Sequence, residues 1–187
     1  MTSEDLDLRT RLVAAGVELL AEEGLAALSL REIARRAGVS HGAPRRYFPT
    51  HLTLLSAIAR EGFGQLGALT AGAAGPTPRA HVAELARVYL EFARSNPGMY
   101  ELMFRHDLLE SGELGLRDTS LPLFEQLVRL VAQLRPEPAV VAGALWANLH
   151  GLAQLRRWGS LQLATGTEDF EPVLRSALDA HLGPETR

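Results

Sequence analysis

Cysteine is absent from the 187 residues, and so is lysine. Without cysteine the chain can hold neither a disulfide framework nor a thiolate metal site, and it has no thiol nucleophile. All nineteen basic residues are therefore arginines. Long apolar runs are missing too, since none approaches the roughly twenty residues that a membrane-spanning helix requires.

The first thirty residues do not have the basic start and apolar run of a signal peptide. They carry six acids among their apolar positions: Glu4, Asp5, Asp7, Glu18, Glu22 and Glu23. Hydrophobic residues make up 47% of the chain and charged residues 22%, which is a globular composition. We therefore expect a soluble, cytoplasmic protein with one domain, or two small ones that share a core.

Charge is distributed unevenly along the chain. Residues 29–60 hold six arginines and one acid, a net charge of +5, whereas residues 61–187 hold eleven arginines and fifteen acids, a net charge of −4. A basic segment on an acidic body is typical of a surface that meets a polyanion such as nucleic acid. On charge alone, a solvated face without a partner explains the pattern equally well.

Apolar residues recur at three- and four-residue steps over almost the whole chain, which predicts an all-α fold of about nine helices. Gly24 would end the first helix, and Thr50 would cap the fourth. A helix that opens at Pro97 is expected to reach His106, and residues 107–119 are expected to form a loop. Later helices are predicted over 121–134, 138–157 and 168–182.

A Gly/Ala/Pro-rich stretch at residues 72–78 is the one plausible domain boundary. It predicts a first domain over residues 1–70 and a second over residues 71–187.

Residues 29–48 read SLREIARRAGVSHGAPRRYF and form the most informative stretch. Ser29 and Glu32 have the spacing of a capping box, which opens a short helix. Gly38 allows a sharp turn, and Ser40 can cap a second short helix. Two short helices around a tight turn are typical of a helix-turn-helix motif, whose second helix enters the major groove of DNA. A plain helical hairpin is the alternative.

The second helix of this motif carries the chemistry that DNA binding needs. Pro44 and Phe48 lie one turn apart and should face inward, which leaves five outward residues: His41, Gly42, Ala43, Arg45 and Arg46. Arginine can bond both O6 and N7 of guanine, and one such pair gives about 1–3 kcal/mol of base discrimination. Ser29 and Tyr47 can hold phosphates. The sequence therefore predicts a duplex DNA partner with guanines at the contacted positions.

The segment 8–63 resembles the DNA-binding domain of the TetR family of transcriptional regulators. The residues that carry this resemblance are Ile33-Ala34, Ala37-Gly38-Val39-Ser40, Gly42 and Tyr47-Phe48-Pro49. The resemblance implies phosphate contacts at Ser29 and Tyr47 and base contacts at His41, Ala43, Arg45 and Arg46. Ser40 and His51 complete the expected DNA-binding set. Three positions differ from the family's pattern, which usually has an aliphatic residue at Pro44, tyrosine at Arg45 and lysine at His51. Pro44 should force the recognition helix to begin just before it, because a proline deeper in a helix costs about 3 kcal/mol.

The second half resembles the effector-binding and dimerisation domain of the same family, of the type named for a Trp-His-Gly signature. Asn96-Pro97-Gly98-Met99-Tyr100, Met103-Phe104 and Trp146-Ala-Asn-Leu-His150-Gly151 carry this resemblance. Seven residues could line an apolar, aromatic cavity, or could be ordinary core: Phe92, Tyr100, Met103, Phe104, Leu127, Trp146 and His150. Such a cavity would suit a small hydrophobic or aromatic effector.

One helix-turn-helix buries too little surface for selective binding, so such motifs act in symmetric pairs on half-sites about 34–36 Å apart. We expect a homodimer through a four-helix bundle made of residues 138–157 and 168–182 of both subunits. Packing of these faces within one subunit is the alternative. The expected function is a repressor that an effector releases from a palindromic operator, with a coupling of about 1–3 kcal/mol.

Two other classes of function remain as alternatives. An all-helical enzyme could be imagined around His106-Asp107 near Glu101, or around His150 with Glu91. The chain has no His-Glu-x-x-His run, no phosphate loop and no Gly-x-Ser-x-Gly elbow, so we expect no catalytic residue, no metal and no cofactor. A helical ligand-binding module without DNA binding is the other alternative, against which the arginines at 45 and 46 argue.

Overall fold

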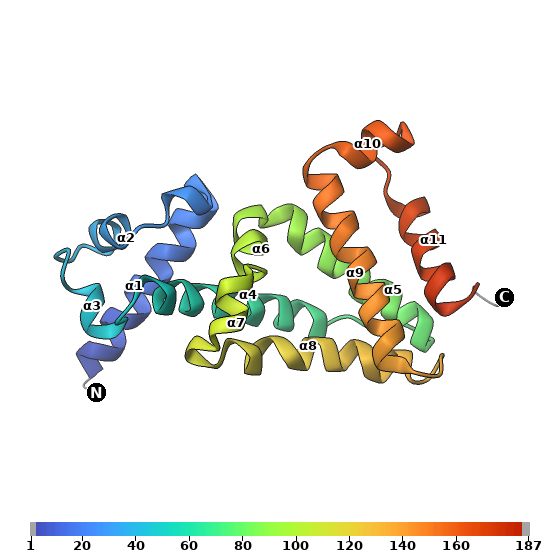
Figure 1. Ribbon diagram of the computed structural model, residues 1–187, viewed down its shortest axis with the longest axis horizontal. Coiled ribbons are helices and arrows are strands. Elements are labelled where there is room, and N and C mark those ends of the chain that lie inside the picture. The colour runs from blue at the N-terminus through green and yellow to red at the C-terminus, as the bar shows by residue number, and fades with distance from the viewer. Residues whose placement is uncertain (1–2, 185–187) are drawn as a thin grey trace. The chain divides into compact units, whose positions relative to one another are not determined.

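A computed structural model describes residues 3–184 (Figure 1). Over this range the chain forms eleven α-helices and two short 3-10 helices and contains no strand, so the predicted all-α fold is confirmed. The elements, in chain order, are α1 (Ser3–Glu23), η1 (Leu25–Ala27), α2 (Leu30–Arg36), α3 (Pro44–Tyr47), α4 (His51–Ala71), α5 (Pro78–Ser95), α6 (Pro97–Met103), α7 (His106–Ser111), η2 (Glu113–Gly115), α8 (Leu116–Val131), α9 (Pro138–Arg157), α10 (Ser160–Thr165) and α11 (Glu171–Leu182).

The helices pack into two compact units that interleave along the chain. Unit 1 comprises residues 1–65 and 96–120, and unit 2 comprises residues 66–95 and 121–187. One boundary therefore falls within α4 and another within α8. The functional division predicted from the sequence, at residue 70, is a different partition, because it assigns 96–120 to the second domain.

The core of unit 1 forms where α1 crosses α4. Leu12, Ile33 and Ile58, from α1, α2 and α4, are fully buried. A Cβ on Gly16 would lie 2.3 Å from Cδ1 of Ile58, so any larger residue there would require the Ile58 side chain to move. This crossing supports the short helices α2 and α3.

Helix α6 belongs to the same core. A Cβ on Gly62 of α4 would lie 2.6 Å from the sulfur atoms of Met99 and Met103, which are both buried. A Cβ on Gly98 would lie 2.9 Å from the carbonyl oxygen of Leu20. Helix α6 is thus packed directly against α4 and α1, although it lies more than fifty residues after α2 in the sequence.

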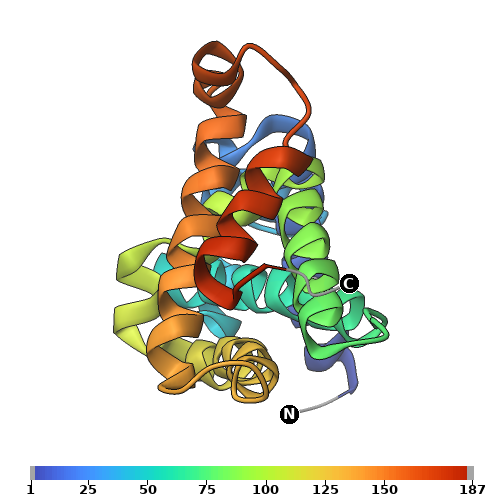
Figure 2. The ribbon, with the colours of Figure 1, turned by 90° about the vertical axis from the view of Figure 1, so that its right-hand side faces the viewer.

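Unit 2 is built around α9, which contacts α5, α10 and α11. Helices α5, α9 and α11 lie side by side (Figure 2). Their buried faces include Val82, Leu85, Leu145, Leu149, Leu174 and Leu178. Arg87 of α5 also pairs with Glu171 of α11 at 2.8 Å. The apolar periodicity found in the sequence is therefore the buried face of each helix.

Several predicted boundaries are confirmed. Helix α1 ends before Gly24, and the side chain of Thr50 accepts a hydrogen bond from the Thr53 N–H at 3.0 Å at the start of α4. Helix α9 occupies the predicted range Pro138–Arg157. These signals lie within four residues of the boundary they mark, which is why they could be found without tertiary information.

The prediction of a loop over residues 107–119 is wrong. This range contains the end of α7, the turn η2 and the beginning of α8. Gly112, with a φ of 64°, makes a tight turn between helices, while Leu108 and Leu116 are fully buried and anchor the helices on either side. The helix expected from Pro97 to His106 is also interrupted, since α6 ends at Met103 and α7 begins at His106.

The last part of the chain also differs from the prediction. The short helix α10 was not predicted, and α11 begins at Glu171 rather than near 168. Asp169 accepts a hydrogen bond from the Glu171 N–H at 3.0 Å, and Thr167 accepts one from the Asp169 N–H at 3.1 Å. These side chains stabilise a turn ahead of the helix rather than its first turn.

Candidate nucleic-acid interface

Helix α2 begins as the sequence predicts. The Ser29 side chain accepts a hydrogen bond from the Glu32 N–H at 3.2 Å. After α2, Gly38 adopts a φ of 70°, in the left-handed region that glycine occupies without strain. The Val39 N–H then bonds the Ala34 carbonyl oxygen at 3.0 Å, which closes the helix end.

Helix α3 begins at Pro44 and not at Ser40. Because Pro44 has no N–H, it cannot bond the Ser40 carbonyl oxygen, which accepts from the Ala43 N–H at 3.0 Å instead. Residues 41–43 form a turn, and the cap residue of α3 is Ala43. The prediction that Ser40 caps this helix is therefore wrong, and α3 is only four residues long.

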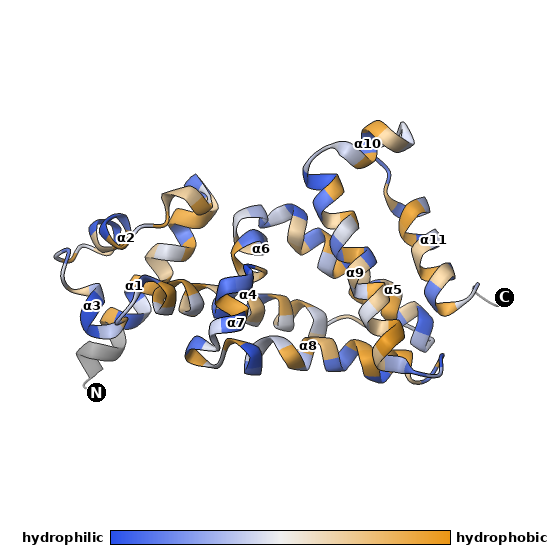
Figure 3. Ribbon diagram, viewed as in Figure 1, coloured by the Kyte–Doolittle hydropathy of each residue, from blue (hydrophilic) through white to orange (hydrophobic). Residues whose placement is uncertain are grey.

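The inward and outward residues of α3 lie as predicted. Pro44 is buried and Phe48 is fully buried, whereas Arg45 and Arg46 are exposed. His41 and Gly42 of the preceding turn are exposed too, and Ala43 is half-buried. In Figure 3, hydrophilic residues (blue) are prominent along both α2 and α3.

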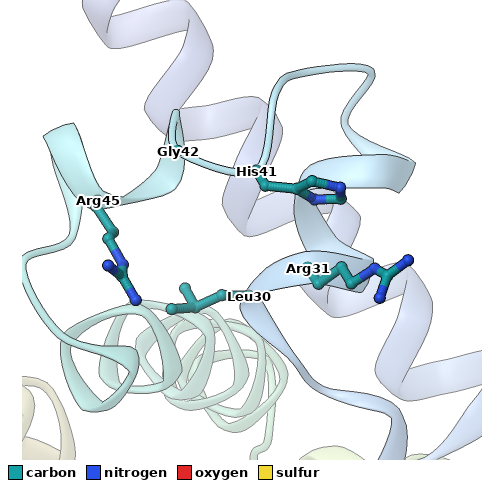
Figure 4. A pocket seen from close by; sticks show the side chains of 5 residues that line it. All are labelled: Leu30, Arg31, His41, Gly42 and Arg45. Carbon is teal, nitrogen blue, oxygen red and sulfur yellow. The ribbon is translucent and has the colours of Figure 1, made fainter.

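A hollow of about 660 Å³ lies on this surface (Figure 4). Its lining residues are Leu30, Arg31, His41, Gly42 and Arg45. In Figure 4 Leu30 lies between Arg45 on one side and His41 with Arg31 on the other. The sequence did not place Leu30 and Arg31 at the site. Arg31 could have been found from the helical period, because it lies two residues, or about half a turn, from the fully buried Ile33 of α2.

Part of the basic segment is neutralised by ion pairs. The Arg35 guanidinium bonds both carboxylate oxygens of Glu32 and lowers the pKa of that carboxyl group. Arg36 reaches back to α1, where it pairs with Glu22 at 2.5 Å and with Glu23 at 2.8 Å. These two arginines are therefore engaged within the protein.

Three other arginines of the segment are exposed and keep their charges available. Among the side chains of residues 8–184, none forms an ion pair or a side-chain hydrogen bond with Arg31, Arg45 or Arg46. Arg31 and Arg45 both line the hollow, and Arg46 follows Arg45 on α3. The arginines that remain available to a ligand therefore lie on the helix-turn-helix surface, and two of the three line the hollow.

The remaining residues of the predicted DNA-binding set lie around this surface. Ser29, Ser40 and His51 are exposed, and Tyr47 is half-buried at the end of α3. Ser29 precedes α2 and His51 is the first residue of α4. All of them belong to unit 1.

The predicted effector-contacting residues fall into two groups. Tyr100, Met103 and Phe104 belong to unit 1, where the Tyr100 and Phe104 ring centroids are 5.0 Å apart. Tyr100 and Met103 are buried, and Phe104 also packs edge-on against Phe63 at 5.7 Å.

The second group, Phe92, Leu127, Trp146 and His150, belongs to unit 2. The Tyr89 hydroxyl and His150 Nδ1 lie 3.0 Å apart, and the Trp146 ring packs against that of His150 at 6.0 Å. Burial lowers the pKa of His150 and favours the neutral imidazole. Trp146 is 39% exposed, while Phe92 is buried and Leu127 is half-buried.

The described part of the chain contains neither a candidate metal site nor a candidate membrane span. No group of three or more His, Asp or Glu side chains there is arranged to hold a metal ion. None of the helices in residues 3–184 combines the length and the apolar character that a bilayer crossing demands.

Comparisons with known proteins agree with this geometry. The model for "Bacterial regulatory proteins, tetR family" matches residues 12–58, and the model for "Tetracyclin repressor-like, C-terminal domain" matches residues 82–181. The chain belongs to the TetR family. It is a DNA-binding transcriptional regulator, as the helix-turn-helix pattern predicted. The Trp-His-Gly subtype stays a prediction.

Individual relatives of the regulator cover different shares of its length. The HTH-type transcriptional regulator BetI of Rhizobium meliloti is 39% identical over 82 residues, which span 43% of this chain and 40% of BetI. A solved structure from Rhodococcus sp. RHA1, of unknown function, is 29% identical with a TM-score of 0.79 and covers 94% of this chain and 93% of its own. The multidrug binding protein EbrR, solved with imidazole, is 28% identical with a TM-score of 0.60, covering 96% of each chain.

Proposed function

We propose that this regulator is a repressor that binds a palindromic operator as a homodimer and leaves it when a small hydrophobic or aromatic effector binds. The observation that carries the proposal is the exposed group of Arg31, Arg45 and Arg46 on the helix-turn-helix surface. Arginines without protein partners can bond phosphates and guanine edges. Residues 1–70 would then serve DNA binding, and residues 71–187 effector binding and dimerisation.

The DNA contacts divide by chemistry. Arg45 and Arg46 of α3 would read bases together with the turn that precedes them, residues 41–43. The hydroxyls of Ser29, Ser40 and Tyr47, and the imidazole of His51, would hold phosphates at the edges of this surface. Arg31, next to the hollow, adds a cation that the sequence analysis did not assign.

Dimerisation is supported by the outer face of α9. A Cβ on Gly143 or Gly151 would meet no atom within 4 Å, so these positions lie beside open space. At the two ends of the helix, Val140 is 68% exposed and Trp158 is 66% exposed. A face with small residues at its centre and large apolar residues at its ends suits close packing against a second copy of the helix. With the predicted helix near 168–182, this would form the four-helix bundle.

The effector would contact the aromatic residues named above. In unit 2, Trp146 and His150 offer a ring face and a polar group next to each other. EbrR is a multidrug binding protein, which supports a small organic ligand for this chain as well. We propose neither an enzymatic activity nor a cofactor, and we propose a cytoplasmic location, where operator DNA is accessible.

Selection of bound duplexes from a random pool, followed by titration from 50 to 200 mM salt, tests the DNA-binding part of the proposal. We expect a palindromic site with guanines in each half, and a steep log–log salt dependence of about −0.9 per phosphate neutralised. Adding neutral aromatic molecules found by a thermal-shift screen should then weaken operator binding. Absence of any preferred duplex would leave a ligand-binding module, and an unchanged affinity with every bound molecule would exclude release.

The dimer is tested by placing a charge on the outer face of α9. Ala147 is exposed on this helix, so Ala147→Glu should leave the fold intact but place two like charges near each other in the dimer. Sedimentation should show a shift from dimer to monomer. Ala14→Glu, at an exposed position of α1, is the matched control and should remain a dimer. A dimeric Ala147→Glu variant would rule out this face.

A further inference from the structure

Helix α1 contributes two arginines to the helix-turn-helix, and both lie outside the basic segment 29–60. They are Arg9 and Arg11, which are two residues apart on the part of α1 that packs against α2 and α3. Neither belongs to the set assigned to DNA contact above. Their positions at the two ends of the motif's turn point to a different role.

Arg11 holds the end of α2. Its Nη2 donates a hydrogen bond of 2.6 Å to the carbonyl oxygen of Ala37, the residue that caps α2. Helix carbonyls at a C-terminus lack partners within the helix, and a cationic donor there is favoured by the helix dipole. The next residue, Gly38, takes the left-handed conformation that turns the chain toward α3. Arg11 therefore fixes the point from which the turn departs.

Arg9 holds the end of α3. Its guanidinium carbon lies 5.2 Å from the centroid of the Phe48 ring, within the range of a cation–π contact. Phe48 is fully buried and caps α3, and its N–H bonds the Pro44 carbonyl oxygen at 2.8 Å. A helix of only four residues has little stability of its own, so such external contacts determine how it lies.

We propose that Arg9 and Arg11 are positioning residues for operator recognition: they fix the orientation of α3 relative to α2 and do not contact DNA themselves. This rests on the proposed function, in which the outer side of α2 and α3 binds duplex DNA. The contrast with Arg31, Arg45 and Arg46 carries the argument. The Arg9 and Arg11 side chains reach from α1 to Phe48 and to the Ala37 carbonyl oxygen, whereas no ion pair or side-chain hydrogen bond among the described side chains engages the other three.

The two roles predict different binding data. A phosphate ligand strengthens binding to any duplex, and losing it lowers the salt slope by about 0.9. A positioning residue acts on the alignment of α3 with the base edges, so its loss weakens binding to the selected operator and leaves binding to a scrambled duplex unchanged. The ratio of the two dissociation constants separates these cases.

The test uses Arg9→Met and Arg11→Met, which keep an apolar stem and remove the guanidinium, with Arg31→Met as the matched control. Dissociation constants are measured for the selected operator and for a scrambled duplex between 50 and 200 mM salt, on the full chain, after thermal melts confirm folding. For Arg9→Met and Arg11→Met we expect the specificity ratio to fall by about tenfold, comparable to losing one base contact. Their salt slope on the scrambled duplex should match that of the unmodified chain, while Arg31→Met lowers it by about 0.9.

Arg9→Lys keeps a cation above the Phe48 ring and should restore most of the ratio. If Arg11→Met fails to fold, the Arg9 pair of variants still decides the question for that residue. A scrambled-duplex slope lowered by about 0.9 with an unchanged ratio would make these residues phosphate ligands and overturn the proposal, as would no change in either quantity. An unmodified chain without salt-dependent duplex binding would instead contradict the proposed function.

Discussion

Arginines have different roles on α5 of unit 2 and on the helix-turn-helix surface of unit 1. In unit 2, Arg79 and Arg87 of α5 pair with Asp179 and Glu171 of α11, so these charges connect two helices. On the helix-turn-helix surface of unit 1, Arg31, Arg45 and Arg46 are exposed instead. The difference shows that the partner of an arginine, and not its presence, separates an arginine that holds the fold from one that can bind DNA.

The same distinction applies inside the basic segment. Its net charge of +5 overstates the charge available to a ligand, because Arg35 pairs with Glu32 and Arg36 pairs with Glu22 and Glu23 of α1. The charge count indicated the region that we propose for DNA binding. The ion pairs show which arginines within that region remain available to a ligand.

The largest expected effect comes from removing two exposed arginines. The double variant Arg45→Gln, Arg46→Gln should lose about 2–6 kcal/mol of operator binding, or roughly thirtyfold or more in Kd, because each can supply a bidentate base contact. Fluorescence anisotropy with the selected operator measures this loss. The control Arg94→Gln, Arg129→Gln removes two exposed, paired arginines of unit 2 and should leave the Kd unchanged. Equal losses of operator affinity in both double variants would show that exposed and paired arginines do not differ in their contribution to DNA binding.

A smaller effect, on stability, is expected from breaking a pair that connects α5 and α11. Arg79 is 12% exposed, so Asp179→Ala would leave a nearly buried guanidinium without its partner. We expect a loss of about 1–3 kcal/mol in the free energy of unfolding. Urea denaturation measures it, and operator binding by the folded variant should be unaffected. A variant as stable as the unmodified chain would mean that this pair contributes nothing.

Releasing a paired arginine should have a modest effect of the opposite sign on DNA binding. The double variant Glu22→Gln, Glu23→Gln removes the partners of Arg36, and exposed pairs of this kind contribute only about 0–1 kcal/mol to stability. Binding to a scrambled duplex should therefore tighten at 50 mM salt while the melting temperature changes little. Should binding stay the same, Arg36 lies too far from the DNA to contribute even when released.

The smallest effect concerns pH and tests the buried histidine of unit 2. Burial lowers the pKa of His150 in the folded state below its ordinary value of 6.5. At a pH below 6.5 the unfolded chain therefore binds a proton at His150 more readily than the folded chain does. Stability should therefore fall as the pH is lowered from 7 to 5, and His150→Gln should reduce this dependence. Denaturant midpoints at both pH values give the comparison.

Glu91 does not interfere with that measurement. Hydrogen bonds from Arg94 and Ser95 lower its pKa from 4.5 to about 2, so the stability that it contributes is present above pH 4.5 and is lost as the pH falls toward 2. An unchanged pH dependence in His150→Gln would show that another group titrates between pH 5 and 7.

Much of the fold could be predicted, and the errors have a common cause. The all-α class and the caps at Ser29 and Thr50 follow from spacing and capping chemistry. Ser40 was wrongly predicted to cap α3 because it is a good capping residue, but the start of α3 at Pro44 was indicated by the proline, which forbids the hydrogen bond that a helix starting at Ser40 would need. The helices within 107–119 were missed because glycines and acids were interpreted as a loop, although Leu108 and Leu116 bury fully on either side of Gly112.

The residues of the candidate site, too, could be predicted only where the signal lies close by in the sequence. Arg45 and Arg46 were predicted to face outward because Arg45 directly follows the inward Pro44 and Arg46 lies two residues before the inward Phe48, so the helical period alone directs them outward. Arg9 and Arg11 were not found, because nothing near them in the sequence indicates a contact with Phe48 or with the Ala37 carbonyl 26 residues away.

The amino-acid sequence by itself determined the helical fold, the position of the DNA-binding motif and its outward arginines, because these depend on residues within a few positions of one another. The tertiary structure alone decided which charges are neutralised and where α6 packs. Arg36 pairs with Glu22, 14 residues away in the sequence, and Arg87 pairs with Glu171, 84 residues away. Met99 and Met103 of α6 pack against Gly62 of α4. Such contacts depend on how whole helices approach each other, which no local pattern records.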